Sequence, residues 1–420
     1  MEAFGMKTGE IEIHDTARRL ELAVKNLRED GNISDANRKT IEKFYIYMLS
    51  RGNGKHRVIK YIYKLRLYAA LLNKDMEKAD KDDIVMIMEQ IDGKPYSLWT
   101  KHDYKIMVKR FYKWLRGLDE QNEYPPEVKW IRSGLKNGRM KMPEELWSEE
   151  DVKKLVNAAD NPRDKALIFS LYESGCRVGE IASRRIKHIQ FDKYGAVVIV
   201  EGKTGMRRIR LVASVPALSA WLDCHPEKDN PDAPLWIGLG SRNKGDALDY
   251  KAVSGIFKRT AERSGVKKRS NPHLFRHSRA TFLANHLTES QLKEVFGWAQ
   301  GSDMAAVYVH LSGRDTDNAI LHVNGIETEN GEKSGSVLKP KNCPRCEFVN
   351  GATSKFCNRC AAPLNIETAL SIEEKTNGLA QSFAEALGNN GGLTEVVKRP
   401  DMSRADLERL ARMIMGYMRG

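Results

Sequence analysis

Arg177 occupies a position in this sequence that suits the binding of a phosphate. It follows Gly175 and precedes a helical pattern over 178–186, so it is expected where a helix begins. The first turn of a helix offers free N–H groups and the positive end of the helix dipole, and both attract anions. Glu180 lies one turn further on and can hold the Arg177 guanidinium in place.

A second arginine is predicted to lie in the same kind of place. Pro272 marks the start of another helix, and His273 and Arg276 both fall in its first turn, on one face. Guanidinium groups are planar, permanently charged and bidentate, so two of them suit the non-bridging oxygens of a phosphodiester. Such contacts strengthen as a pentacoordinate transition state gains charge.

The order of these residues resembles the signature of the tyrosine recombinases of the phage integrase family, in particular the Xer type. The sequences SGCRVGEI, HLFRHSRATFLA and VYVHLS carry the resemblance. It is strong over 147–321 and weaker over the N-terminal part, which in this family clamps DNA from the opposite side. Six positions match in the family's order: Arg177, Lys203, His273, Arg276, Trp298 and Tyr308.

The resemblance implies a role for each position. Arg177 and Arg276 bind the scissile phosphate, and Tyr308 attacks it to give a 3′-phosphotyrosyl enzyme and a free 5′ hydroxyl. Lys203, in the turn of a predicted hairpin, protonates the leaving oxygen, and His273 assists proton transfer or orients the phosphate. One phosphate ester replaces another of similar energy, so neither ATP nor a catalytic metal is expected.

One position departs from the common pattern. Trp298 stands where most of the family has a histidine, although some members also have tryptophan. An indole N–H can donate a hydrogen bond to a phosphate oxygen but cannot accept a proton. No acid–base role is therefore expected for Trp298.

Simpler interpretations stay open for each residue taken alone. Arg207 or Arg208 competes with Lys203, and His277 and His310 are interpreted as structural. Two other functions are also compatible with the sequence. The first is a type IB-like topoisomerase, which uses similar chemistry, and the second is a DNA-binding regulator that has lost catalysis.

Four cysteines near the C-terminus predict a structural zinc site. Cys343 and Cys346 form one C-x₂-C pair, and Cys357 and Cys360 form another ten residues later. Four thiolates suit a closed tetrahedral Zn²⁺ site, and the sequence resembles a zinc ribbon of an archaeal style. So short a segment cannot bury a real core, so metal binding is expected to supply its folding energy.

Basic stretches with interleaved aromatic residues predict a DNA-binding surface in the first third of the chain. The segment 51–74 has seven Lys or Arg and no acid, and 101–116 has six bases and one acid. A solvated helix face is the simpler alternative. The candidate phosphate contacts, including three in a basic connector, are Lys55, Arg57, Lys60, Lys64, Lys105, Lys109, Lys113, Arg132, Lys136 and Arg139.

Apolar periodicity predicts a mainly α fold with a small antiparallel β-sheet. We expect a helical DNA-binding domain, a mixed α/β catalytic domain of tyrosine recombinase type and a small zinc ribbon. The predicted divisions are 11–118 (helical domain), 119–146 (basic linker), 147–322 (catalytic domain), 323–342 (flexible tether), 343–364 (zinc ribbon) and 365–420 (helical tail).

The composition fits a nucleic acid partner. The chain of 420 residues has a formal charge of +13 and a pI near 9.3, which favours a polyanion. No signal peptide or membrane-spanning stretch is apparent, so a cytoplasmic, nucleoid-associated protein is expected. The resemblance implies double-stranded DNA attachment sites, a homotetramer on DNA (a monomer or dimer when free) and, in some systems, an accessory or directionality factor.

Overall fold

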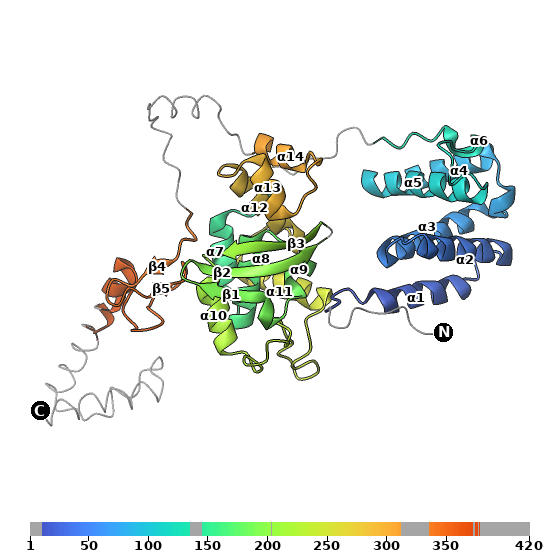
Figure 1. Ribbon diagram of the computed structural model, residues 1–420. Coiled ribbons are helices and arrows are strands. Elements are labelled where there is room, and N and C mark those ends of the chain that lie inside the picture. Colours follow the sequence, from blue (N-terminus) through green and yellow to red (C-terminus); the bar gives the residue numbers. More distant parts are fainter. Residues whose placement is uncertain are drawn as a thin grey trace, which may run out of the picture.

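A computed structural model describes residues 11–134, 145–202, 204–311, 336–372, 374–376 and 378. The N-terminal helices form one unit, and a second unit surrounds a small sheet (Figure 1). The mainly α fold with a small antiparallel sheet is therefore confirmed. Among the described residues, no helix is both long and apolar enough to span a lipid bilayer.

The helical unit has its own apolar core, which Phe44, Tyr68 and Phe111 help to fill. Ser34 caps its second helix by accepting a hydrogen bond from the Asn37 backbone N–H at 3.2 Å. Its elements are α1 (Thr16–Arg28), α2 (Asp35–Ser50), α3 (Lys55–Leu72), the 3₁₀ turn η1 (Met76–Lys78), α4 (Lys81–Gly93), α5 (Leu98–Leu115) and α6 (Pro126–Lys129).

The helical unit extends further along the chain than predicted. The short helix α6 lies inside the predicted linker, and Val128 and Ile131 are buried in the core of the helical unit. The boundary expected at residue 118 is therefore wrong, because the chain returns to bury two more apolar side chains before it leaves the unit.

The second unit is built around α8, which is buried along nearly its whole length. Ser148 and Asp151 form a capping box at the start of its first helix. Its helices are α7 (Glu149–Asn157), α8 (Pro162–Ser174), α9 (Val178–Ala182), η3 (Ile186–His188), α10 (Val215–Asp223), α11 (Tyr250–Ser264), α12 (Pro272–Ala284), α13 (Glu289–Phe296) and α14 (Met304–Leu311).

The sheet of this unit has three antiparallel strands, β1 (Ile189–Asp192), β2 (Gly195–Gly202) and β3 (Gly205–Leu211). The hairpin of β2 and β3 was predicted, with Glu201 opposite Met206 next to the turn. Strand β1 was not predicted, because its side chains are mostly exposed and show no apolar alternation. The helix predicted over 178–186 ends at Ala182.

A small third core holds the end of this unit together. Ala280 and Ala284 of α12, Phe296 of α13, and Ala305 and Tyr308 of α14 are buried against one another. Tyr308 is thus placed by packing between three helices rather than by a loop.

Segments outside the two units also contact the second one. Near the N-terminus, Ile13 is buried in its core. Near the C-terminus, Leu338 is 2% exposed in the same core, and the Val337 N–H donates to Glu149 Oε2 at 2.9 Å. Residues 336–338 are therefore bound to the second unit, and this part of the predicted tether is not a free linker.

The cysteine segment follows as a two-stranded hairpin of β4 (Lys341–Asn342) and β5 (Val349–Asn350). Residues 366–372 after it are helical, in agreement with the start of the helical tail predicted over 365–420. Residues 374–376 and 378 are also helical, and the rest of the predicted tail lies outside the described residues.

Candidate active site

Arg177 lies where α8 ends and α9 begins. Gly175 ends α8 in a left-handed conformation (φ +58°), and a Cβ there would lie 2.5 Å from the Phe296 ring. Arg177 is the N-cap of α9, and its backbone N–H donates to Glu180 Oε2 at 2.8 Å. Its Nη1 donates to Glu180 Oε1, also at 2.8 Å, so the predicted contact between the two side chains is present.

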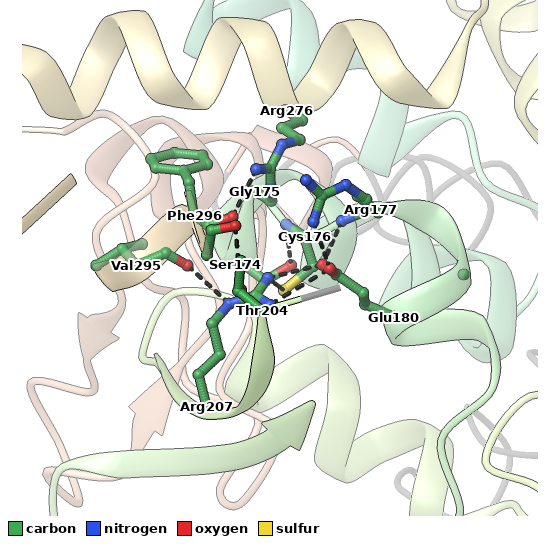
Figure 2. A network of polar contacts seen from close by, with 12 residues as sticks. Ser174, Gly175, Cys176, Arg177, Glu180, Thr204, Arg207, Arg276, Val295 and Phe296 are labelled. Carbon is green, nitrogen blue, oxygen red and sulfur yellow. Dashed lines mark hydrogen bonds and ion pairs between the residues drawn. The ribbon is translucent and has the colours of Figure 1, made fainter. Parts of the chain in front are cut away.

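Glu180 has a second cationic partner that sequence reasoning missed. Arg207 of β3 donates to Glu180 Oε2 at 2.7 Å and to the Val295 carbonyl at 3.1 Å (Figure 2). Glu180 is 5% exposed. Burial opposes its ionisation, but the hydrogen bonds and charges of Arg207 and Arg177 bring the pKa of Glu180 below its ordinary value. Arg207 is thus a buried bridge from the sheet to α9 and α13.

Lys203 itself lies outside the described residues, but its neighbours show where the hairpin turn sits. A Cβ on Gly202 would lie 2.5 Å from Glu180 Oε1 and 3.0 Å from Arg207 Nη1. On the other side of the turn, the Thr204 hydroxyl donates to the Gly297 carbonyl at 3.3 Å. The described ends of the turn therefore flank the arginine cluster.

Arg276 of α12 enters the same cluster from the opposite side (Figure 2). It is 4% exposed, and it donates to the Gly175 carbonyl at 3.0 Å and to the Phe296 carbonyl at 2.5 Å. Burial, followed by the charge of Arg177, lowers the pKa of Arg276 to about 10. Among the described residues, this cluster therefore brings three guanidiniums together near the carboxylate of Glu180, and its excess positive charge attracts anions.

Tyr308 lies beside this cationic cluster in a stack of aromatic rings. Its ring is parallel to that of Trp298, with centroids 5.3 Å apart and an interplanar angle of 3°. The Arg276 guanidinium lies 5.5 Å from the Trp298 centroid. Burial raises the pKa of Tyr308 to about 12, although the charge of Arg276 opposes the shift. The tyrosine and two of the predicted cations therefore share one site.

Two histidines line α12 next to Tyr308. The hydroxyl of Tyr308 hydrogen-bonds to Nδ1 of His277. His273 lies one turn earlier, and the two imidazole rings meet edge to face, with centroids 4.9 Å apart. The sequence interpretation of His277 as structural missed this contact. The sequence shows that His277 lies one helical turn after His273, but it does not show that Tyr308, which lies on another helix, contacts His277.

Five of the predicted DNA contacts of the helical unit, all on α3 or α5, have partners within that unit. Lys60 forms an ion pair with Asp103, as does Lys64, and Lys105 pairs with Asp92 at 3.1 Å. Lys109 donates to the Ile131 carbonyl at 3.2 Å and, like Lys113, lies over the Tyr124 ring, because the end of the unit folds back over α5. The predicted DNA contacts on α5 are thus half-buried and already have partners within the unit.

The other predicted DNA contacts are either exposed or lie outside the described residues. Lys55 and Arg57, at the start of α3, are exposed, and so is Arg132. Lys136 and Arg139 lie outside the described residues. All of the DNA contacts stay predictions.

The four cysteines of the C-terminal segment converge. Their sulfur atoms lie within 4.8 Å of one another, with Cys343 and Cys360 at 3.5 Å and Cys346 and Cys357 at 3.6 Å. A tetrahedral zinc ion with bonds of about 2.3 Å places its sulfur ligands about 3.8 Å apart, so the geometry fits such an ion. The backbone N–H groups of Arg345 and Arg359 point at Cys343 and Cys357, each at 3.4 Å.

Known proteins resemble the chain in the part that carries the site. Residues 146–314 match the family model of the phage integrase family. Tyrosine recombinase XerA of Pyrococcus horikoshii is 26% identical over 267 residues, which is 63% of this chain and 86% of that protein. Tyrosine recombinase XerC of Xanthomonas campestris is 33% identical over 180 residues, 41% of this chain and 52% of that protein.

Among solved structures, the XerH site-specific recombinase in a post-cleavage complex with palindromic difH substrate has a similar fold. Its TM-score is 0.51 at 19% identity, and the match covers 76% of this chain and all of that one. The arginine cluster and the adjacent Tyr308 lie within residues 146–314, which match the family model. Residues 146–314 thus form a domain that matches the phage integrase family, and the chain is similar to Xer tyrosine recombinases.

Proposed function

We propose that this protein is a site-specific DNA recombinase that cleaves and rejoins DNA through a phosphotyrosyl intermediate on Tyr308. The observation that carries the proposal is the cluster of Arg177 and Arg276 around a buried Glu180, with Tyr308 beside it. The names of its relatives, which are tyrosine recombinases, support the same conclusion.

The chemistry follows from the residue types. Arg177 and Arg276 bind the non-bridging oxygens of one phosphate, and their charge stabilises the transition state. Tyr308 attacks the phosphorus while Lys203 protonates the 5′ oxygen that leaves. His273, exposed at the start of α12, orients the phosphate, and the Trp298 N–H donates to an oxygen. The exchange of one phosphate ester for another conserves bond energy, so the reaction requires no ATP.

The proposed substrate is double-stranded DNA that carries specific attachment sites. Exchange of strands between two sites requires protomers on both, so we propose a homotetramer on DNA, formed from monomers or dimers. An accessory factor that sets direction is compatible with this scheme. The place of action would be the cytoplasm, on the nucleoid.

The test of the proposal is covalent capture. Purified protein is incubated with a library of random-sequence DNA duplexes, denatured with detergent, and the DNA that stays attached is sequenced. We expect an adduct on Tyr308 and enrichment of one sequence, and we expect Tyr308→Phe to form no adduct. An adduct that survives in Tyr308→Phe would exclude Tyr308 as the nucleophile. Supercoil relaxation without sequence enrichment would indicate a topoisomerase instead.

We also propose that the four cysteines bind one structural zinc ion. A ribbon this short has little core of its own, so the metal would supply its folding energy. We expect one zinc per chain by elemental analysis, and Cys357→Ser should abolish it. A chelator should make the region of residues 341–364 sensitive to protease and leave adduct formation on the selected duplex unchanged. Loss of adduct formation with an intact fold would contradict a purely structural role.

A further inference from the structure

The hydroxyl of Tyr308 has little access to water. Tyr308 is 4% exposed, and its ring is held against Trp298 in the core formed by α12, α13 and α14. Because burial raises its pKa to about 12, the side chain is a neutral phenol in this structure. A phenol must lose its proton as it attacks phosphorus, and in so enclosed a place the proton passes to a neighbouring side chain.

His277 is the neighbour suited to accept that proton. Its Nδ1 atom is hydrogen-bonded to the Tyr308 hydroxyl, and the two rings lie with centroids 5.9 Å apart. Nδ1 is a proton acceptor when the imidazole is neutral with its proton on Nε2. Trp298 and Arg276, which also lie close to Tyr308, carry N–H donors and no acceptor.

The position of His277 on α12 connects it to the rest of the site. It directly follows Arg276, which lies in the cationic cluster, and it meets the ring of His273 edge to face. His273 is exposed at the first turn of the helix, whereas His277 is half-buried one turn further in. His277 therefore contacts both the exposed His273 and the hydroxyl of Tyr308.

We propose that His277 is the catalytic residue that takes the proton of Tyr308 during cleavage and returns it during rejoining. This inference rests on the proposed function. As the bond from the Tyr308 oxygen to phosphorus forms, the phenolic proton moves to Nδ1 of His277. The bond from phosphorus to the 5′ oxygen breaks, and that oxygen receives its proton from Lys203. In rejoining, each proton takes the reverse path, so no other reactant is needed.

The first experiment compares two variants of the full-length protein on the duplex selected by covalent capture. His277→Asn keeps a polar atom near the place of Nδ1, and so the contact with Tyr308, but it cannot take up a proton. His277→Ala removes both. We expect both variants to bind the duplex as the wild type does and to form the adduct about 10²–10⁴-fold more slowly. His286→Asn, at an exposed position just after the end of the same helix, is the matched control and should react at the wild-type rate.

Chemical rescue separates proton transfer from positioning. Imidazole added to His277→Ala should restore adduct formation at least partly, whereas thiazole, which has a similar shape and is far less basic, should not. Equal rescue by both compounds would show that His277 only fills space. Adduct formation by His277→Asn within about threefold of the wild type would also overturn the proposal, since general base catalysis contributes far more than that.

A modified duplex identifies which proton is lost. Replacing the 5′ bridging oxygen by sulfur gives a leaving group that departs as a thiolate and needs no proton. Such a duplex should restore cleavage in Lys203→Ala and leave His277→Ala slow, because Tyr308 must still be deprotonated. Restoration of both variants would place His277 on the leaving-group side and overturn the assignment. Failure of the wild type to form any adduct would instead refute the proposed function itself.

Discussion

At the scale of single residues, Glu180 organises the site without being its reactive group. It is buried, and it bonds at the same time to Arg177, which is proposed to bind the phosphate, and to Arg207 of β3. A buried carboxylate is stable here because two guanidiniums compensate its charge. Glu180 is therefore a positioning residue, and its loss would leave Arg207, whose side chain is 9% exposed, without its ion-pair partner.

We predict that Glu180→Ala lowers the free energy of unfolding by about 3–5 kcal/mol, the usual effect of removing one member of a buried ion pair. Urea denaturation measures this value. The same variant should also bind the selected duplex more weakly, because Arg177 loses its anchor. Glu262→Ala, on the exposed side of α11, should change the stability by no more than about 0.5 kcal/mol. Equal stability of the two variants would contradict a stabilising role for the ion pairs of Glu180 with Arg177 and Arg207.

The ionisation of Glu180 has a consequence for pH. Its pKa in the folded protein lies below the ordinary value of 4.5, so the folded state favours the charged form. The stability from this group is therefore fully present above pH 4.5 and is lost as the pH falls through the lower folded pKa. Glu180→Gln should show a smaller loss of stability over that range in thermal unfolding at a series of pH values.

At the scale of elements, the β2–β3 hairpin is fastened to the end of α13. Thr204 donates to the Gly297 carbonyl, and Arg207 donates to the carbonyl of Val295. Gly297 ends α13 with φ +58°, and a Cβ there would lie 2.8 Å from Arg207 Nη1 and 3.1 Å from the Thr204 hydroxyl. The glycine therefore permits both the helix end and the close approach of the hairpin that carries Lys203.

We predict that Gly297→Ala slows adduct formation, because the added methyl group pushes the hairpin away from the arginine cluster. Gly265→Ala is a matched control: Gly265 also ends a helix, α11, with φ +70°, but a Cβ there has nothing within 4 Å. Both variants should lose about 1–2 kcal/mol of stability from the left-handed backbone. In a single-turnover assay, only Gly297→Ala should cleave DNA more slowly than the wild type. Equal cleavage rates of the two variants would contradict a role for the contact between the hairpin and the end of α13.

At the scale of the whole molecule, a residue that precedes the helical unit in the sequence packs in the core of the second unit. Ile13 is 5% exposed in the core of the second unit, and its carbonyl accepts the Tyr250 backbone N–H at 2.8 Å. Tyr250 opens α11, where backbone N–H groups lack partners within the helix. His14 then contacts both Tyr250 and His56, the latter at the start of α3. Residues 13 and 14 thus tie the two units together near α11, independently of the linker.

We predict that Ile13→Ala detaches this segment from the second unit. Loss of a buried isoleucine side chain weakens packing by about 2 kcal/mol or more, so the Tyr250 amide should exchange its hydrogen at least about tenfold faster. Hydrogen exchange followed by mass spectrometry of the peptide that starts α11 measures this. Leu22→Ala, at a position 52% exposed on α1, should leave the exchange unchanged. Unaltered exchange in Ile13→Ala would show that the segment does not stabilise α11.

The sequence by itself determined what depends on a few neighbouring residues. The helix start at Arg177, the contact from Glu180 to Arg177 three residues away, the pairing of β2 with β3 and the spacing of the four cysteines are all local patterns. Helix periodicity and capping act over one or two turns, so they can be read without a fold. The chemical types at the six matched positions are likewise properties of the sequence.

Only the tertiary structure decided the contacts between distant segments. Arg207 reaches Glu180 across 27 residues and His277 reaches Tyr308 across 31 residues, and neither pair shares a helix or strand. The cations of α5 were predicted to contact DNA, yet the chain that folds back over α5 gives several of them partners inside the unit. The partner of a side chain depends on which elements pack together, and that packing is a property of the whole fold.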